Sequence, residues 1–388
     1  MYKRKKTDLK RGLQIVALLL MIVVAPLTAK ITMKPYLQAV TQNSIYVLAE
    51  SDSKDTVKVD FSKDSSFSQS ATTESIDEII DGRKKYFMHK IKLSPLDHSS
   101  RYNYRVFQQE GKVSKKEKQE EAKQYFYGSF HTAMAEGSTF RFAIMGDCRS
   151  DTVVHSKIAK LIKEKNPLFS IYLGDLCFGN EYFYWKKEFF IDDELELISK
   201  VPFFNAVGNH EQWKPNTLAV QKAPESKSRS EAYYSFDYGD IHFLIINTEV
   251  NYSKISPQYK FIIDDLRKSK KKWKIVVGHI PVYCCGHYGN NSKLIEIANE
   301  AFIPSKVDIY LSGHSHFYQH NEVDKIKYLI VAGGGAPLYT PDSCEWTKRT
   351  EQTYNYAICD ASPSELRIRV YNLRDDIIDE IILRKEDK

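Results

Sequence analysis

Five short motifs of one design constrain how this chain of 388 residues can fold. In each motif a carboxylate, amide or imidazole side chain directly follows a glycine. The motifs, in chain order, are Gly146-Asp147, Gly174-Asp175, Gly208-Asn209-His210-Glu211, Gly278-His279 and Gly313-His314-Ser315-His316. Apolar, strand-like segments precede the first four, at residues 140–145, 169–173, 202–207 and 273–277. Polar residues just past the carboxyl ends of parallel strands gather at one edge of a sheet, so the motifs predict a single site in an α/β domain.

The residue types in these motifs indicate what the site binds. Carboxylate and amide oxygens mixed with imidazole nitrogens suit hard and borderline metal ions. One such motif alone carries little weight, because Gly239-Asp240 has the sequence of a tight turn and Gly286-His287 fits a loop. Five motifs in a fixed order indicate a hydrolytic site with two metal ions.

The first 29 residues have the layout of a secretory signal peptide. Six Lys and Arg residues precede an apolar run at 13–24, and Ala25-Pro26-Leu27-Thr28-Ala29 follows it. We predict cleavage after Ala29 and a secreted or periplasmic location. A permanent membrane anchor is the alternative, but the apolar run is shorter than the ~20 residues that a span needs. No later stretch is apolar for long enough, so no stable membrane span is expected after cleavage.

Charge and cysteine content limit the possible partners. The formal net charge is +6, and residues 1–29 carry six basic side chains against one acid, so the mature chain is close to neutral, at about +1. No nucleic-acid binding is indicated by that balance. The six cysteines of an exported protein allow disulfides, and fifteen full pairings are possible. They are Cys148, Cys177, Cys284, Cys285, Cys344 and Cys359. The sequence does not choose a pairing, and it leaves the oligomeric state open.

Two domains are predicted after the signal peptide. Residues 30–135 contain only strand and turn patterns, which predicts an all-β sandwich of the fibronectin type III kind with Tyr102 as its tyrosine corner. Residues 136–388 alternate strands with helices, expected at 152–163, 181–198, 257–268 and 293–301, and end in strands. This pattern predicts an α/β domain of mixed sheets flanked by helices. The sandwich is expected either to bind a ligand or to serve as a structural companion.

Taken in order, the five motifs resemble the calcineurin-like metallophosphoesterase superfamily. The segments Val276-Val277-Gly278-His279-Ile280-Pro281-Val282-Tyr283, Tyr233-Tyr234-Ser235-Phe236 and Gly313-His314-Ser315-His316-Phe317-Tyr318 are similar to the purple acid phosphatase branch. The resemblance implies a phosphoesterase that hydrolyses phosphate monoesters by in-line attack of a metal-activated hydroxide at a two-metal site. A phosphodiesterase or nucleotidase on the same scaffold is the alternative. A non-catalytic binding protein is the rival from another class.

The resemblance also implies a role for each ligand. Asp147 and His316 would bind the first metal, Asn209, His279 and His314 the second, and Asp175 would bridge the two. A bridging carboxylate offsets the repulsion between cations that two-metal hydrolysis holds ~3.5–4 Å apart. Iron, zinc and manganese all remain open as the metals.

Three further residues are implied to take part in catalysis. His210 would bind the phosphate and protonate the leaving oxygen, which suits an imidazole. Glu211 would orient His210, or else be a solvated loop carboxylate. His287 would bind substrate and share the acid role, or else be an ordinary loop histidine.

Two positions depart from the family pattern. Phe178 stands where purple acid phosphatases have a tyrosine that ligates ferric iron, and Arg149 stands where the wider superfamily has a histidine ligand. The first metal therefore loses a side-chain ligand, which water or Tyr182 would have to replace. Arg149 is expected to bind the substrate's phosphate, because its planar fork suits an oxyanion, or to pair with Asp151 or another acid.

Overall fold

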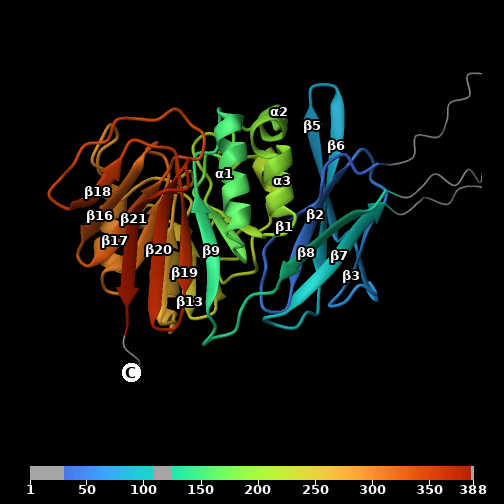
Figure 1. Cartoon of the computed structure of the whole chain (residues 1–388), viewed down its shortest axis with the longest axis horizontal. Coiled ribbons are helices and arrows are strands. Elements are labelled where there is room, and N and C mark those ends of the chain that lie inside the picture. The colour runs from blue at the N-terminus through green and yellow to red at the C-terminus, as the bar shows by residue number, and fades with distance from the viewer. Residues whose placement is uncertain (1–29, 109–123, 386–388) are drawn as a thin grey trace, which may run out of the picture.

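The computed structural model describes residues 30–108 and 124–385, so the predicted signal peptide lies outside the described residues. The described chain forms three sheets (Figure 1). The ten strands of the largest sheet are, in spatial order, β21 (Ile377–Arg384), β20 (Glu365–Asn372), β19 (Asn355–Ala361), β9 (Phe140–Met145), β10 (Phe169–Tyr172), β11 (Phe203–Asn205), β1 (Tyr36–Gln38), β2 (Ile45–Ser51), β6 (Lys84–Leu93) and β5 (Ser75–Asp81).

A seven-stranded sheet packs against the part of the ten-stranded sheet that contains β9 and β10. Its order is β12 (Tyr234–Tyr238), β13 (Ile241–Ile245), β14 (Trp273–Val277), β15 (Ile309–Ser312), β17 (Ile326–Val331), β16 (Tyr318–Val323) and β18 (Thr347–Glu351). Large apolar side chains fill the space between the sheets. Phe142 stacks on Phe169 at 5.0 Å between ring centroids, and its ring meets Phe243 of the other sheet edge-on at 5.5 Å. Both sheets are therefore fixed to one buried core.

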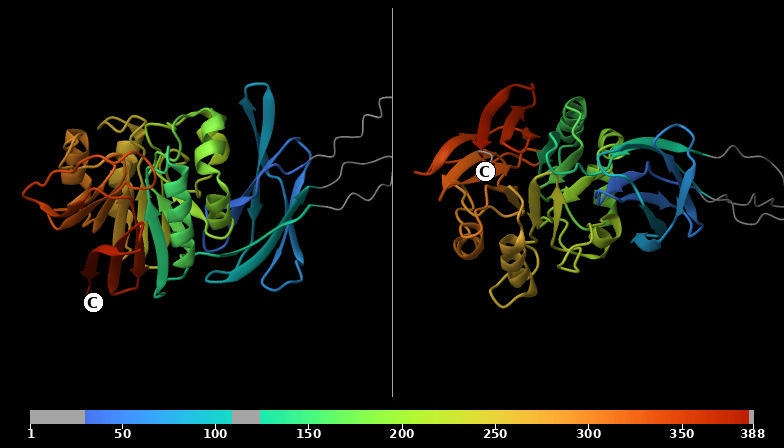
Figure 2. Two further views of the ribbon diagram at one scale, coloured as in Figure 1. Left: turned by 45° about the horizontal axis from the view of Figure 1, so that its top comes forward. Right: turned by 90° about the horizontal axis from the view of Figure 1, so that it is seen from below.

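Helices cover the outer faces of these two sheets, and Figure 2 shows the two groups on opposite sides. One group packs on the ten-stranded sheet through a second apolar cluster, and the other on the seven-stranded sheet through a third. The helices are α1 (Thr152–Glu164), α2 (Tyr182–Tyr184), α3 (Asp192–Ile198), α4 (Pro215–Val220), α5 (Pro257–Lys268) and α6 (Ser292–Ile297), with π-helical turns η1 (Trp185–Phe189) and η2 (Ala298–Phe302). The prediction of mixed sheets flanked by helices is confirmed.

The N-terminal region is a sandwich of two sheets. Strands β1, β2, β6 and β5 form one face, and β4 (Gln69–Thr72), β3 (Val57–Ser62), β7 (Arg101–Gln108) and β8 (Phe126–His131) form the other. Tyr102 is buried, and its hydroxyl accepts a hydrogen bond from the Asp97 N–H at 3.0 Å, the contact that a tyrosine corner makes. Backbone hydrogen bonds join the sandwich to the α/β domain, because β1 pairs with β11 in parallel at Gln38 and Phe203.

Element predictions succeeded where side chains alternate or repeat clearly. The helix predicted at 257–268 matches α5, which begins with Ser256 as its cap and Pro257 in its first turn. The helix predicted at 181–198 is wrong as one element, because α2, η1 and α3 divide it. The mostly exposed edge strands β4 and β5 were missed, since neither has an apolar face to reveal it. In the described residues no helix is long and apolar enough to span a membrane.

Candidate metal centre

The predicted ligands meet where strands of the ten-stranded and the seven-stranded sheet end. Asp147 follows β9, Asp175 follows β10 and Asn209 lies in the loop after β11. His279 follows β14, and His314 follows β15. We predicted the edge of one sheet, and this is wrong: the first three strands belong to the ten-stranded sheet and the last two to the seven-stranded sheet. The site therefore lies between two stacked sheets rather than along one.

Several of the glycines that precede the predicted ligands are needed because a side chain there would clash with another predicted ligand. A Cβ on Gly208 would lie 2.3 Å from Asp175 Oδ1, and a Cβ on Gly313 would lie 2.5 Å from Asp147 Oδ2. Three ligand residues themselves have positive φ angles, 58° at Asp147, 53° at Asp175 and 69° at His314. Side chains rarely tolerate this region, and such strain concentrates at functional sites. The repeated glycine-ligand pairs thus follow from close packing of the ligands on one another's backbone.

We call the residues predicted to bind the second metal the second-metal half of the site. They are Asn209, His279, His314 and one oxygen of Asp175. Asn209 Oδ1 lies 3.0 Å from His279 Nε2 and 2.9 Å from His314 Nδ1. Asp175 Oδ1 lies 3.4 Å from His279 Nε2. His279 Nδ1 donates to the Leu173 carbonyl oxygen at 2.7 Å, so Nε2 is the ring nitrogen that faces Asn209 Oδ1. An amide oxygen, a carboxylate oxygen and two imidazole nitrogens converge here, and this donor set fits a metal ion.

The pKa of His314 supports the same reading. Burial, and then the neighbouring His279, lower this pKa to about 3, so the ring is neutral near pH 7. A neutral imidazole has a nitrogen lone pair free for a metal ion.

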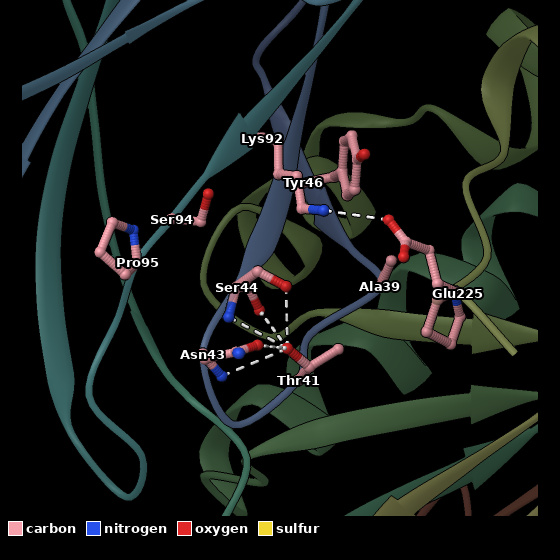
Figure 3. Close-up of a pocket in the computed structure, with 10 residues that line it drawn as sticks. Ala39, Thr41, Asn43, Ser44, Tyr46, Lys92, Ser94, Pro95 and Glu225 are labelled. Carbon is pink, nitrogen blue, oxygen red and sulfur yellow. Dashed lines mark hydrogen bonds and ion pairs between the residues drawn. The ribbon is translucent and has the colours of Figure 1, made fainter.

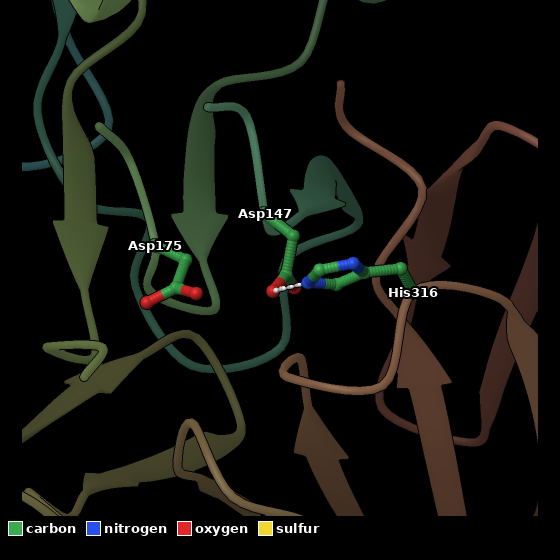
Figure 4. A group of neighbouring side chains, drawn as sticks. All are labelled: Asp147, Asp175 and His316. Atoms are coloured by element: carbon green, nitrogen blue, oxygen red, sulfur yellow. Dashed lines mark ion pairs between the residues drawn. The ribbon is translucent and has the colours of Figure 1, made fainter. Parts of the chain in front are cut away.

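The first-metal half of the site consists of Asp147, His316 and the other oxygen of Asp175. One ligand atom from each of the three residues lies within 4.8 Å of the other two. Figure 4 shows these three side chains, with the His316 ring pointing toward Asp147. His316 Nε2 lies 3.4 Å from Asp147 Oδ1, and His316 Nδ1 donates to the Pro337 carbonyl oxygen at 2.7 Å. Both Asp147 oxygens accept from the His314 N–H, at 3.1 and 3.0 Å. By residue type these three donors could also bind a metal.

Arg149 lies within this first-metal half. Its Nε is 3.4 Å from Asp175 Oδ2, its Nη2 is 3.4 Å from His316 Nε2, and the residue is only 8% exposed. Of the two expectations for Arg149, an ion pair with an acid is the one observed, and the acid is Asp175, the predicted bridging ligand. Asp151 instead caps the start of α1. The guanidinium thus contacts two of the three donors of this half.

His210 lies beside the bridging aspartate. Its Nδ1 donates to the Phe178 carbonyl oxygen at 2.8 Å, which leaves Nε2, 3.7 Å from Asp175 Oδ2, as the nitrogen facing the site. The His210 N–H donates to Asp175 Oδ1 at 3.0 Å. Burial raises the pKa of Asp175, but the charges of His279, His210 and Arg149 together hold this pKa below its ordinary value. The Asp175 carboxyl is therefore ionised in the folded protein.

Glu211 has neither of its predicted roles. Its carboxyl is buried, and Oε1 accepts from the Gly208 N–H at 2.8 Å and the Asp175 N–H at 3.1 Å. No hydrogen bond joins its side chain to the His210 ring among the contacts of the described residues. Burial, and then the charge of Asp175, raise the pKa of Glu211 to about 8. Glu211 is a positioning residue that fixes the backbone of two ligand loops.

Aromatic residues surround the centre, and sequence reasoning missed most of them. The ring of Tyr288 lies 4.2 Å from that of His314, and Tyr339 stacks on His316 at 4.2 Å. His287 is exposed and contacts these tyrosines rather than a ligand, with its ring centroid 4.9 Å from that of Tyr288. Tyr288 adjoins a motif that the sequence displayed, whereas Tyr339 comes from a loop after β17 that carries no signal.

Of the two expected replacements for the missing tyrosine ligand, water and Tyr182, the structure excludes Tyr182. The Tyr182 hydroxyl is buried and hydrogen-bonds to Glu50, away from the ligands. The Phe178 ring is 49% exposed, lies 5.4 Å from the His210 ring and has the Arg149 guanidinium 6.0 Å from its centroid. No tyrosine oxygen therefore reaches the first-metal half from either position.

One disulfide joins two loops beside the centre. Cys285 bonds to Cys344, which ties the loop of His287 and Tyr288 to the loop that follows Tyr339. Cys148 and Cys177 are buried with raised thiol pKa values, chiefly through burial, and neither has the exposed, thiolate-favouring setting of a reactive cysteine.

A cavity of about 480 Å³ lies away from the centre, between the sandwich and the loop that contains Glu225 (Figure 3). Its polar groups are paired with one another. Lys92 Nζ lies 3.0 Å from Glu225 Oε1, and Thr41 Oγ1 accepts from the Ser44 N–H at 3.0 Å. The side chains that line this cavity do not converge on one point as the predicted metal ligands do.

The part of the chain that contains the site is similar to known proteins. Residues 140–318 match the model for calcineurin-like phosphoesterases, a range that includes every candidate site residue. Purple acid phosphatase 15 of Arabidopsis thaliana is 25% identical over 330 residues, which cover 67% of this chain and 60% of that protein. Probable inactive purple acid phosphatase 9 of the same plant is 28% identical over 199 residues, or 40% of this chain and 30% of that protein. The chain thus spans less than two thirds of the length of these relatives.

A solved structure shows the same fold over most of the chain. The purple acid phosphatase from yellow lupin (Lupinus luteus) seeds superposes with a TM-score of 0.77 at 19% sequence identity, covering 91% of this chain and 74% of that one. The region that holds the centre is therefore similar to calcineurin-like phosphoesterases. Within that superfamily the chain is similar to the purple acid phosphatases, which as a family imply a dinuclear metal centre.

Proposed function

We propose that this chain is an exported, metal-dependent phosphatase that hydrolyses phosphate monoesters at the centre between the two sheets. The observation that carries the proposal is the second-metal half, where Asn209 Oδ1 lies 3.0 Å or less from nitrogens of His279 and His314. An amide oxygen and two imidazole nitrogens that converge beside a carboxylate form a donor set that suits a metal ion. The metal, whether iron, zinc or manganese, is left open, and the proposal requires an ion only at this second position.

The chain's own residues account for the remaining steps. A bound metal ion supplies Lewis acidity toward a phosphoryl oxygen and lowers the pKa of a water molecule. Asp175 would hold the metal ion, and the Glu211 carboxyl fixes the Asp175 backbone. His210 is oriented by the Phe178 carbonyl so that Nε2 can hold a proton for the leaving oxygen. Arg149 offers guanidinium N–H groups to an oxyanion at the same place.

Export and domain organisation belong to the same proposal. The Cys285–Cys344 disulfide fits an oxidising compartment, in agreement with a signal peptide at residues 1–29. We divide the mature chain into a fibronectin type III-like domain at 30–135 and a catalytic domain at 136–388. The Tyr102 corner contact and the two-sheet arrangement favour that name for the sandwich.

A chromogenic ester assay tests the function. Protein beginning at Lys30 is loaded with zinc, manganese or ferrous iron and assayed with p-nitrophenyl phosphate and with bis(p-nitrophenyl) phosphate. The proposal predicts faster hydrolysis of the monoester, loss of activity on chelation and its return with metal. His279→Ala should abolish activity, and His242→Ala is the matched control, because His242 is a buried histidine paired with Asp237 and Asp265 outside the centre.

Each other outcome selects a rival. A faster diester reaction would favour the phosphodiesterase alternative. No hydrolysis of either ester, by protein that has bound metal, would favour the non-catalytic binding protein.

A further inference from the structure

We propose that Arg149 supplies the positive charge of the first metal, so that this centre binds one metal ion per chain and completes itself with a guanidinium. The inference rests on the proposed function only in taking the second position as a metal site. It concerns the half of the centre in which three potential donors, Asp147, Asp175 and His316, share their space with an arginine side chain.

The two oxygens of Asp175 face different partners. Oδ1 lies 3.4 Å from His279 Nε2, on the side where the second-metal donors converge. Oδ2 lies 3.4 Å from Arg149 Nε, on the side that the family pattern assigns to the first metal. A bridging carboxylate needs a positive neighbour at each oxygen, and here one of the two is already part of the chain.

The same guanidinium edge reaches the second donor of that half. Arg149 Nη2 lies 3.4 Å from His316 Nε2. His316 Nδ1 donates to the Pro337 carbonyl, so Nε2 of the neutral ring is an acceptor, and the arginine N–H satisfies it. A metal ion bound to Asp175 Oδ2 and His316 Nε2 would have to displace this edge or remain beside a second cation.

Arg149 keeps its charge, and several contacts hold it where it lies. A guanidinium stays protonated in proteins, whereas a lysine or histidine in its place could become neutral. The residue is 8% exposed, and its own N–H donates to the Asp175 carbonyl oxygen at 3.3 Å. Its Nη1 also donates to Ser150 Oγ at 3.3 Å. A buried charge of this kind is retained where it is paired.

This assignment gives one cause to both departures from the family pattern. A tyrosinate is useful beside a metal that needs an anionic oxygen, but Arg149 already has a carboxylate partner. The Phe178 ring instead faces the guanidinium, 6.0 Å from its centroid, where an aromatic face attracts a cation. Arg149 and Phe178 therefore form a matched pair in place of a metal and its tyrosine.

Metal counting tests the inference directly. The wild type is dialysed to equilibrium against zinc or manganese, and bound metal per chain is measured by plasma mass spectrometry. We expect one ion in the wild type and two in Arg149→His, which replaces the guanidinium by an imidazole ligand. Arg149→Met removes the charge without adding a ligand, and should also gain a second ion, with weaker affinity. Arg141→His is the matched control, because Arg141 pairs with Asp360 outside the centre, and it should keep one ion.

The outcomes separate this inference from the proposed function. Two ions in the wild type would overturn the inference and leave phosphatase activity possible, and this count requires no variant to fold. An unchanged count in both Arg149 variants, with intact circular dichroism, would also overturn it. One ion in the wild type and two in Arg149→His, without hydrolysis of any ester, would support the inference and refute the proposed function.

Discussion

The two halves of the centre share a bridging aspartate but differ in what faces it. In the second-metal half, nitrogens of His279 and His314 lie 3.0 and 2.9 Å from Asn209 Oδ1, a donor set that suits a metal ion. In the first-metal half, Asp147 and His316 are also buried, yet the Arg149 guanidinium lies between His316 and Asp175. The same electrostatic requirement, a cation at each carboxylate oxygen, is thus met in two ways.

The two halves share one backbone feature. Asp147 and His314 both have positive φ angles directly after a glycine that follows a strand. Strained backbone is therefore present on both sides of the site. Arg149, two residues past Asp147, is the side chain that distinguishes the first-metal half.

Removing the shared carboxylate should break both halves at once. Asp175→Asn leaves the second metal without its anionic ligand and Arg149 without its ion-pair partner, so turnover should fall by at least ~10³-fold together with metal content. Turnover of p-nitrophenyl phosphate and bound metal are measured on the same sample. Asp265→Asn, at a buried aspartate paired with His242, is the control. Retention of more than about a tenth of wild-type activity would refute the catalytic assignment.

His210 should matter for the leaving group and not for either cation. With His210→Ala we expect a loss of about 10²-fold or more for alkyl phosphates, a smaller loss for nitrophenyl esters and unchanged metal content. The exposed His287, replaced by alanine, serves for comparison and should have a much smaller effect. Equal losses for good and poor leaving groups would instead indicate that His210 only positions the phosphate.

Glu211 should affect stability through the backbone that joins the two halves. Glu211→Ala leaves the Gly208 and Asp175 N–H groups buried without an acceptor, at about 1–3 kcal/mol for each. Glu211→Gln keeps an acceptor and should melt close to the wild type.

Metal-free protein adds a pH test of Glu211. Its folded pKa of about 8 lies above the ordinary 4.5, so the folded state holds a proton that the unfolded state releases. Stability from this group is therefore complete below pH 4.5 and is lost as the pH rises through 8. The melting temperature of Glu211→Gln should lack that dependence, and an identical pH profile in wild type and variant would contradict the account.

Phe178→Tyr should have the smallest effect. The wild type has no tyrosinate for ferric iron and should be colourless, and a tyrosine at 178 beside an unchanged Arg149 should bind no additional metal. Visible absorption spectra after loading with ferric iron measure this. A charge-transfer band in the single variant would show that Arg149 yields its place to iron, whereas a band seen only with Arg149→His as well would sharpen the contrast between the halves.

The candidate ligands were found through a local signal, a glycine followed by a polar residue, which in four of the five motifs comes after an apolar segment. The same local signal says nothing about which sheet each strand joins, so the second sheet was missed. Arg149 was recognised as a departure, but its partner was not, since Asp175 and His316 reach it only through the fold. Glu211 looked like a loop carboxylate because nothing in the sequence shows that its oxygen meets two backbone N–H groups.

Contacts between residues far apart in the chain could not be predicted from the sequence either. Tyr339 and the Cys285–Cys344 bond depend on how loops far apart in sequence come together. The pairing of β1 with β11, which joins the sandwich to the catalytic sheet, rests on one register contact between Gln38 and Phe203. No composition or periodicity marks such a contact, whereas α5, with its cap and amphipathic pattern, could be predicted to the residue.

Anomalous X-ray diffraction at the zinc edge, on crystals of zinc-loaded wild-type protein, tests the central claim most directly. The account predicts one strong peak per chain, about 2.0–2.2 Å from His279 Nε2 and His314 Nδ1, with the Arg149 guanidinium still between Asp175 and His316. A second peak of similar height, bound to Asp147 and His316 with Arg149 turned away, would contradict it.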